Sequence, residues 1–201
     1  MRAALPDDAE RIGLAHVRSW QAAYAGHFPQ EFLDGLDPAR RAEGWRRRLE
    51  GSLPDREALL VAETSTGIAG FASVGPCRDD EIGAGGLYAI YLLPEVWGHG
   101  LGRQLMVASL EAPGRFDFDE ATLWVLTGNG RARRFYEAGG WQVDGATKVD
   151  EGPGFPIAEV RYRVALPEGA PCAATGSPRR WPGAHGSRQP ARGPDLPTRL
   201  R

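Results

Sequence analysis

Residues 92–103 read Leu-Leu-Pro-Glu-Val-Trp-Gly-His-Gly-Leu-Gly-Arg, and this stretch is the most informative in the sequence. An apolar run ends at Pro94, and three glycines then alternate with other residues just before an amphipathic segment. Glycines let successive backbone N–H groups turn into one concavity, and a following helix adds its unpaired N-terminal donors and partial positive charge. The spacing predicts a strand–loop–helix unit whose loop holds an anion such as a diphosphate, with Arg103 as an added cation.

This loop differs from the common phosphate-binding motifs. It has neither the Gly-Lys-Ser/Thr of a Walker loop nor the third glycine at the dinucleotide-binding spacing, which argues against nucleotide hydrolysis. Taken alone, the three glycines also fit an ordinary connection between a strand and a helix.

A second cluster follows an apolar strand and reads, from Asn129 to Trp141, Asn-Gly-Arg-Ala-Arg-Arg-Phe-Tyr-Glu-Ala-Gly-Gly-Trp. Asn129 is suited to cap a helix, and the glycine pair is suited to end it. Within that helix Phe135 is expected to face the core while Tyr136 points elsewhere. By itself, Tyr136 is more simply explained as a packed aromatic residue.

Together the two clusters resemble the acetyl-CoA motifs of the GNAT superfamily of acetyl-CoA-dependent N-acetyltransferases. The resemblance covers most of residues 1–166. It implies a fold of the α/β (α+β mixed) class, with a mixed, mostly antiparallel central sheet and helices on both faces. It also implies an enzyme that transfers an acetyl group from acetyl-CoA to a primary amine of a small molecule or peptide, by direct attack on the thioester.

The resemblance assigns roles to residues. The strand before the loop would pair with the pantetheine arm and thioester through its backbone, the loop would bind the diphosphate, and Tyr136 would protonate the departing thiolate. The implied cofactor-binding residues are Ile90, Tyr91, Leu92, Gly98, His99, Gly100, Leu101, Gly102, Arg103, Asn129 and Tyr136. The amine acceptor would bind around Trp20, Tyr24, His27 and Phe28.

No general base is assigned. Many relatives carry a glutamate in the strand before the loop or in the next strand, where this chain has Gly86 and Trp124. Asp79, Asp80 and Glu81 are alternatives, although a solvated acidic loop explains them more simply, and water is also able to relay the proton. Two rival functions therefore stay open: a GNAT-fold module that binds acyl-CoA without turnover, and a protein that binds no CoA ester.

Periodicity predicts the other elements. Helices are expected at 7–25, 38–50, 100–112 and 130–138. Strands are expected at 58–63, 68–74, 87–93, 121–126, 141–143 and 160–164. This order predicts a mixed sheet with helices packed on its faces.

Composition divides the chain after residue 166. Residues 167–201 contain seven prolines, five glycines and six arginines but few large apolar residues, which predicts a disordered Pro/Gly/Arg-rich tail after an N-acetyltransferase domain at 1–166. The tail carries a charge of about +4 and the rest about −6. An acidic body offers no basic surface for nucleic acid and is compatible with an amine-bearing substrate.

The sequence also bears on location, metals and assembly. No run approaches the roughly 18 to 20 apolar residues that span a bilayer, and no signal peptide is visible, so we expect a cytoplasmic protein without a membrane partner. The four histidines and two cysteines show no ligand spacing, so no metal is expected. A homodimer that pairs through the final strand and the strand at Trp141 is compatible with the sequence.

Overall fold

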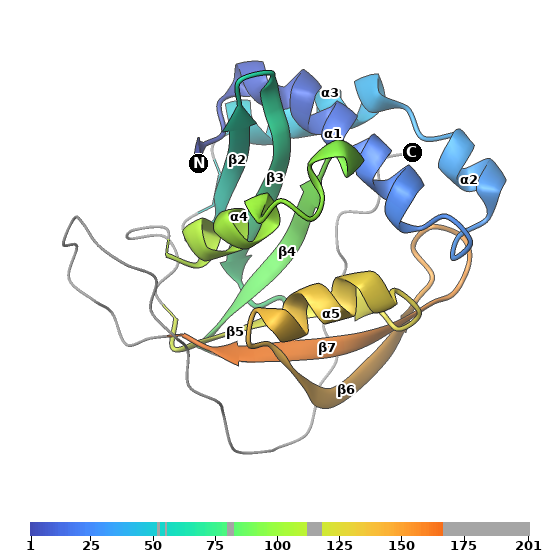
Figure 1. The fold of residues 1–201 in the computed structure, drawn as a ribbon, viewed down its shortest axis with the longest axis vertical. Helices are drawn as coiled ribbons and strands as arrows, with labels where there is room; N and C mark the ends of the chain where they lie inside the picture. The colour runs from blue at the N-terminus through green and yellow to red at the C-terminus, as the bar shows by residue number, and fades with distance from the viewer. Residues whose placement is uncertain (52, 55, 80–82, 112–117, 167–201) are drawn as a thin grey trace. The chain divides into compact units, whose positions relative to one another are not determined.

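The structure is a computed structural model that describes residues 1–201 except 52, 55, 80–82, 112–117 and 167–201. The predicted tail therefore lies outside the described residues. The strands form a seven-stranded sheet in the order β1-β2-β3-β4-β5-β7-β6 (Figure 1). Pairing is antiparallel for β1–β2, β2–β3, β5–β7 and β6–β7 and parallel for β4–β5. The predicted mixed, mostly antiparallel class is confirmed.

The chain divides into two compact units whose segments are interleaved in sequence. The described residues of Met1–Gly75 and Leu87–Phe116 form unit 1, and those of Pro76–Gly86 and Asp117–Arg201 form unit 2. Strand β4 (Ala84–Leu92) contributes its first three residues to unit 2 and the remainder to unit 1.

Unit 1 contains the N-terminal helices and the first strands. Its elements are β1 (Arg2–Ala3), η1 (Pro6–Asp8), α1 (Ala9–Ala23), α2 (Gln30–Asp34), α3 (Pro38–Glu50), β2 (Ala58–Thr64), most of β3 (Gly67–Pro76), the end of β4, η2 (Pro94–Val96) and α4 (Leu101–Leu110).

The core of unit 1 lies between α1 and the strands β2 and β3. Ile12 and Ala15 pack with a cluster of buried strand residues, which are Leu59, Val61, Ile68 and Phe71. Leu60 and Ala62, also buried, point to the other face of β2 because side chains alternate along a strand. Helix α4 contacts β2, and Figure 1 shows it in front of that strand.

Helix α3 begins where the sequence predicted. The Asp37 side chain accepts a hydrogen bond from the Ala39 N–H at 2.8 Å, and Pro38 is the first helical residue, where its missing N–H costs nothing. Helices α1 and α3 approach closely at Gly13. A Cβ added there would lie 2.5 Å from the Pro38 carbonyl oxygen and 2.6 Å from the Ala42 nitrogen.

Unit 2 contains the remaining elements, which are the start of β4, β5 (Glu120–Leu126), α5 (Gly130–Ala138), β6 (Gln142–Asp150) and β7 (Ile157–Ala165). Helix α5 is tied to β7 through the Tyr162 hydroxyl, which accepts from Arg133 Nε at 3.0 Å and donates to Glu137 Oε1 at 2.6 Å. Trp141 and Tyr162 are the largest fully buried side chains of the described chain.

Several boundaries differ from the sequence-based prediction. The predicted helix at 7–25 is divided into η1 and α1, β4 begins three residues earlier, and α4 ends at Leu110. Strand β6 excludes Trp141 and runs to Asp150, because pairing with β7 extends a polar segment that shows no alternation. The short elements β1 and α2 were not predicted, since neither contains enough residues to show a period.

The order of the last strands bears on dimerisation. Strand β7 lies between β5 and β6 and pairs with both, so the final strand has no open edge. Of the two strands predicted to pair across a dimer, only β6 is an edge strand.

The described residues contain neither a membrane-spanning helix nor a metal-binding group. In that part of the chain, no helix has the length and apolar character needed to cross a membrane. The same residues contain no group of three or more His, Cys, Asp or Glu side chains that could hold a metal ion.

Candidate active site

The end of β4 in unit 1 contains the first group of predicted site residues. Within this unit β4 is the outer strand, with β3 beside it, and the chain leaves β4 through a hydrogen bond from the Leu93 N–H to the Ala69 carbonyl at 2.8 Å. Gly70 of β3 allows the close approach. A Cβ there would lie 2.5 Å from the Tyr91 carbonyl oxygen and 2.8 Å from Leu92 Cγ. Gly70 was not named from the sequence, because only the neighbouring strand reveals the need for a glycine.

The glycine loop follows β4 and η2, and a hydrogen bond from the Trp97 side chain stabilises it. The Trp97 indole N–H donates to the Leu92 carbonyl at 2.9 Å, which ties the loop back to the strand that precedes it. An ion pair between Arg18 of α1 and Glu95 holds η2. The Trp97 indole N–H thus supports the loop from within the protein.

The backbone of the loop has an unusual geometry. Gly98 and Gly100 have φ angles of 82° and 80°, which residues with a Cβ rarely adopt, and a Cβ at either position would meet no atom within 4 Å. Gly100 is the N-cap of α4, and no side chain caps the helix there. The first N–H groups of α4, from Leu101, Gly102 and Arg103, therefore have no partner within the helix. An exposed, uncapped helix start behind two left-handed glycines fits a diphosphate.

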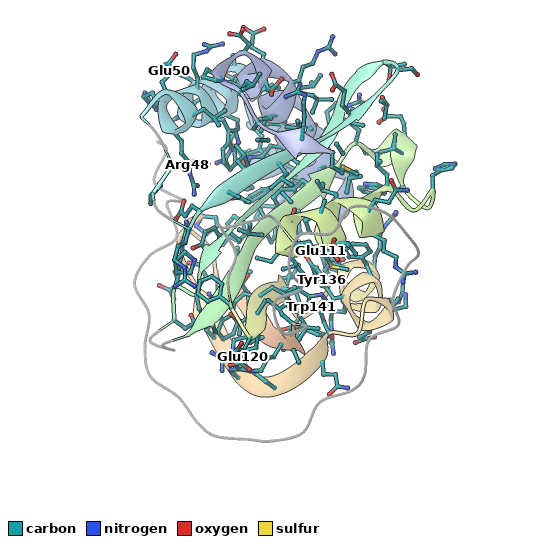
Figure 2. All side chains as sticks on the ribbon, turned by 90° about the vertical axis from the view of Figure 1, so that its left-hand side faces the viewer. Arg48, Glu50, Glu111, Glu120, Tyr136 and Trp141 are labelled. Atoms are coloured by element: carbon teal, nitrogen blue, oxygen red, sulfur yellow. The ribbon has the colours of Figure 1, made fainter. Side chains whose placement is uncertain are left out.

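Unit 2 contains two further predicted site residues, Asn129 and Tyr136. Buried Asn129 caps α5, its Oδ1 accepting from the Ala132 N–H at 3.0 Å, which confirms the predicted cap. The Tyr136 ring lies 6.1 Å from that of Trp141, and Figure 2 labels both side chains. It lies 6.2 Å from the Tyr162 ring. Phe135 and Tyr136 are both half-buried.

The residues expected to bind the acceptor form an aromatic cluster, with one exception. Tyr24 and Phe28 stack with centroids 4.4 Å apart, and the Trp20 ring is 5.2 Å from Tyr24 and 6.0 Å from Phe28. Phe32 and Tyr91 join this cluster at 6.4 and 6.2 Å from Trp20. His27 is exposed and contributes no ring contact among the described residues.

His16 is a buried member of the same cluster that the sequence did not single out. Its ring stacks on Tyr91 at 5.1 Å, and its Nδ1 accepts from the Trp45 indole N–H at 3.2 Å. Burial, with a smaller contribution from the charge of Arg41, lowers the pKa of His16 to about 3. The ring is therefore neutral, and its proton is assigned to Nε2. The only sequence signal was its spacing four residues before Trp20.

Asp79 lies in an ion-pair network. Its Oδ2 accepts from the Trp124 indole N–H and from Arg161 Nη1, both at 3.0 Å. Arg161 also donates to Asp144 at 2.7 Å. The solvated acidic loop that seemed simplest is wrong for Asp79, because the fold supplies a cation 82 residues away in sequence. Asp80 and Glu81 lie outside the described residues.

Glu159 of β7 is a further carboxyl group that the sequence reading missed. Burial raises its pKa, and Lys148, whose Nζ lies 3.4 Å from Oε2, partly opposes that shift. The available sequence signal was its position two residues before Arg161, because residues two apart lie on the same face of a strand.

Comparison with known proteins agrees with this geometry. The sequence model of the acetyltransferase (GNAT) family matches residues 16–141. The chain therefore belongs to the GNAT family and is an N-acetyltransferase.

Its relatives carry the same description. An uncharacterised N-acetyltransferase of Bacillus subtilis, YuaI, is 33% identical over 131 residues, which cover 64% of this chain and 72% of the relative. A probable N-acetyltransferase of Mycobacterium tuberculosis, Rv2775, is 27% identical over 83% of this chain and 95% of its own. Among solved structures, the PaiA N-acetyltransferase of Thermoplasma acidophilum in complex with coenzyme A has a TM-score of 0.66 at 19% identity, covering 82% of this chain and 97% of that one.

Proposed function

We propose that this enzyme transfers the acetyl group of acetyl-CoA to a primary amine of a small molecule or a peptide. The observation that carries the proposal is the loop of Gly98 and Gly100, whose left-handed backbone precedes an uncapped helix and which Trp97 ties to β4. A structural neighbour was solved with coenzyme A, which supports the choice of co-substrate.

The loop residues would hold the diphosphate. Gly98, His99 and Gly100 would present backbone N–H groups, and the start of α4, Leu101 to Arg103, would add further donors and the positive end of the helix dipole. His99 is exposed beside these glycines, which suits contact with phosphate or solvent. The backbone of Ile90, Tyr91 and Leu92 would pair with the pantetheine arm, as an extended ligand adds to a strand edge.

The chemical step would be direct attack. The neutral amine nitrogen forms a bond to the thioester carbonyl carbon, the carbon–sulfur bond then breaks, and the nitrogen loses a proton to water. A backbone N–H near Leu92 would stabilise the oxyanion. The leaving thiolate is a modest base, since a thiol has a pKa near 8.5, and a phenol with a pKa near 10 can hand it a proton as the bond breaks. Tyr136 would supply this proton, and Asn129 would contact the pantetheine arm.

A second function is motivated by the missing glutamates. Gly86 and Trp124 stand where relatives often carry a base, so a module that binds acyl-CoA without turnover is the alternative. Release of free thiol from acetyl-CoA in the presence of amines separates the two, because only the enzyme produces it.

Isothermal titration with acetyl-CoA tests the cofactor site. The intact protein is expected to bind with micromolar affinity, and a variant with both Gly100→Val and Gly102→Val is expected to lose binding. Gly154→Val is the matched control, because Gly154 also has a positive φ, of 91°, and open space around it but lies in the turn before β7. Absence of binding by the intact protein would contradict both functions together.

A further inference from the structure

Three hydrogen-bond donors lie together where α1 packs on α3 in unit 1, and we call them the donor cluster: Arg41, Trp20 and His16. The guanidinium carbon of Arg41 is 5.3 Å from the centroid of the Trp20 ring, and the Trp20 and His16 rings are 5.3 Å apart. Tyr91 stacks on His16 and connects the cluster to the end of β4.

Arg41 differs from the later arginines of α3. Arg46, Arg47 and Arg48 each pair with a carboxylate, namely Glu10, Glu43 and Glu57. Among the residues that the structure describes, Arg41 has no such partner, although it is half-buried.

The surroundings of Arg41 disfavour a positive charge. Burial lowers the pKa of its guanidinium, and the neighbouring charge of Arg40 acts in the same direction. Arg41 also lies in the first turns of α3, near the positive end of the helix dipole. The Trp20 ring face and Tyr91 compensate for this in part. A cation kept in such a place without an anion indicates that a ligand supplies the anion.

The other two members are also donors without acceptors. The Trp20 Nε1 and the His16 Nε2 are buried side-chain nitrogens with no hydrogen-bond partner in the described part of the chain. Because His16 Nδ1 accepts from Trp45, the proton resides on Nε2, so that nitrogen is a donor. Buried polar groups are nearly always satisfied in folded proteins, so unpaired donors and an unpaired cation in one place form an unusual combination.

We infer that the donor cluster binds a carboxylate carried by the acceptor, so that the acceptor is an amine with the chemistry of an apolar amino acid. This inference rests on the proposed acetyl transfer. A guanidinium binds a carboxylate through two parallel hydrogen bonds. The rings around Trp20, which are Tyr24, Phe28 and Phe32, provide an apolar wall for a side chain.

The same cluster disfavours other amines. A polyamine would place a second positive charge near Arg41, and the N-terminus of a long peptide carries an amide where an amino acid carries its carboxylate. Tyr91 lies within the strand segment proposed to hold the thioester, so an acceptor anchored here has its amine in the same region of unit 1.

Matched ligands and two variants test the inference. The ligands are L-phenylalanine, L-phenylalaninamide, phenethylamine and 3-phenylpropanoate, which keep the ring and vary the amine and the carboxylate. Arg41→Gln removes the charge from the cluster, and Arg40→Gln removes the adjacent, exposed charge as a control. Thiol release measures turnover, and isothermal titration measures binding of acetyl-CoA and of 3-phenylpropanoate.

We expect kcat/KM for L-phenylalanine to exceed that for its amide and for phenethylamine at least tenfold. Arg41→Gln should lose this preference and the binding of 3-phenylpropanoate, while it still binds acetyl-CoA. Arg40→Gln should behave as the parent. If Arg41→Gln does not fold, Arg41→Lys, which keeps the charge but not the two-pronged geometry, should show a smaller loss of the same preference.

The carboxylate site and the proposed acetyl transfer would be contradicted by different results. Equal turnover of the acid, the amide and the amine would overturn the carboxylate site and leave acetyl transfer standing. Binding of 3-phenylpropanoate that depends on Arg41, without turnover of any amine, would support the anion site and contradict the proposed function. Binding of 3-phenylpropanoate that is absent, or unaffected by Arg41→Gln, overturns the inference.

Discussion

Tyr136 packs against Trp141 and Tyr162, so its replacement by phenylalanine keeps the ring contacts and removes only the hydroxyl. If this hydroxyl protonates the leaving thiolate, Tyr136→Phe should lower kcat by roughly 10²-fold, within the range for general acids. Titration should show acetyl-CoA affinity close to that of the parent. An unchanged kcat would contradict the role, and Tyr162→Phe, which alters a hydroxyl held by Arg133 and Glu137, is the control for a general effect on α5.

Because His16 is buried in its neutral form, we expect the free energy of unfolding to fall at acidic pH. Its pKa of about 3 in the folded protein lies below the ordinary value of 6.5, so the unfolded chain takes up a proton that the folded chain excludes. The contribution of neutral His16 to the free energy of unfolding is complete above pH 6.5. It falls as the pH drops from 6.5 towards 3, with a loss of about 2 kcal/mol by pH 5. Urea unfolding at pH 7 and pH 5 measures this loss, and His16→Phe should reduce the difference between the two values. An equal difference in the variant would show that other groups cause it.

Individual site residues were predictable to different degrees. Asn129 could be named because a helix cap depends on residues three positions apart. The pairing of Asp79 with Arg161 could not be named, since it depends on partners brought together by the whole fold of unit 2. Arg41 was hidden for a related reason, because its lack of a partner is visible only once the partners of Arg46, Arg47 and Arg48 are known.

Among the elements, α1 and α3 depend on a single close contact. A Cβ at Gly13 would lie within 2.9 Å of three backbone atoms of α3, so the helices would have to move apart. Alanine normally favours a helix over glycine by about 1 kcal/mol, but overpacking costs about 1–3 kcal/mol. Gly13→Ala should therefore lower the free energy of unfolding.

Gly130 of α5 provides the control for that substitution. A Cβ there would meet only the flexible end of the Arg134 side chain, at 3.2 Å. Gly130→Ala should leave the stability unchanged or raise it, as denaturant unfolding would show. A stabilised Gly13→Ala variant would contradict the packing of α1 on α3.

Strands with a strong apolar pattern were predicted close to their observed positions. The prediction failed for a strand that is defined only by its pairing with a neighbouring strand. Strands β2, β3 and β5 lie close to their expected positions because each is a buried apolar run. Strand β6 is mostly exposed and polar, so only its pairing with β7 shows how far it extends.

At the scale of the whole molecule, the described fold ends with β7 and a hydrogen bond from the Leu166 N–H to the Asp119 carbonyl at 2.7 Å. A chain that stops at Leu166 should unfold with the same free energy as the full chain, to within about 0.5 kcal/mol. Chemical denaturation of both chains measures the difference. A loss of more than about 2 kcal/mol would contradict the prediction that residues 167–201 are a dispensable tail.

The fold class was predictable because the order of elements and two motifs agreed, and the sheet has the expected mixed pairing. The division into two units was not, since it separates residues within the single strand β4. No change of composition marks that boundary, because Gly86 and Leu87 are both buried strand residues.

This interleaving has a consequence for the synthesis of the protein. A ribosome delivers the chain from the N-terminus, but β1 pairs through Arg2 with Val61, and unit 1 still needs residues after 87. The segment 76–86 is made earlier, yet its partner in β5 begins only at Glu120. Unit 1 can be completed once residue 116 has been made, when only the 76–86 segment of unit 2 exists, whereas the parts of unit 2 lie on either side of residues 87–116. A gene cut at any single point therefore cannot separate the two units into two fragments.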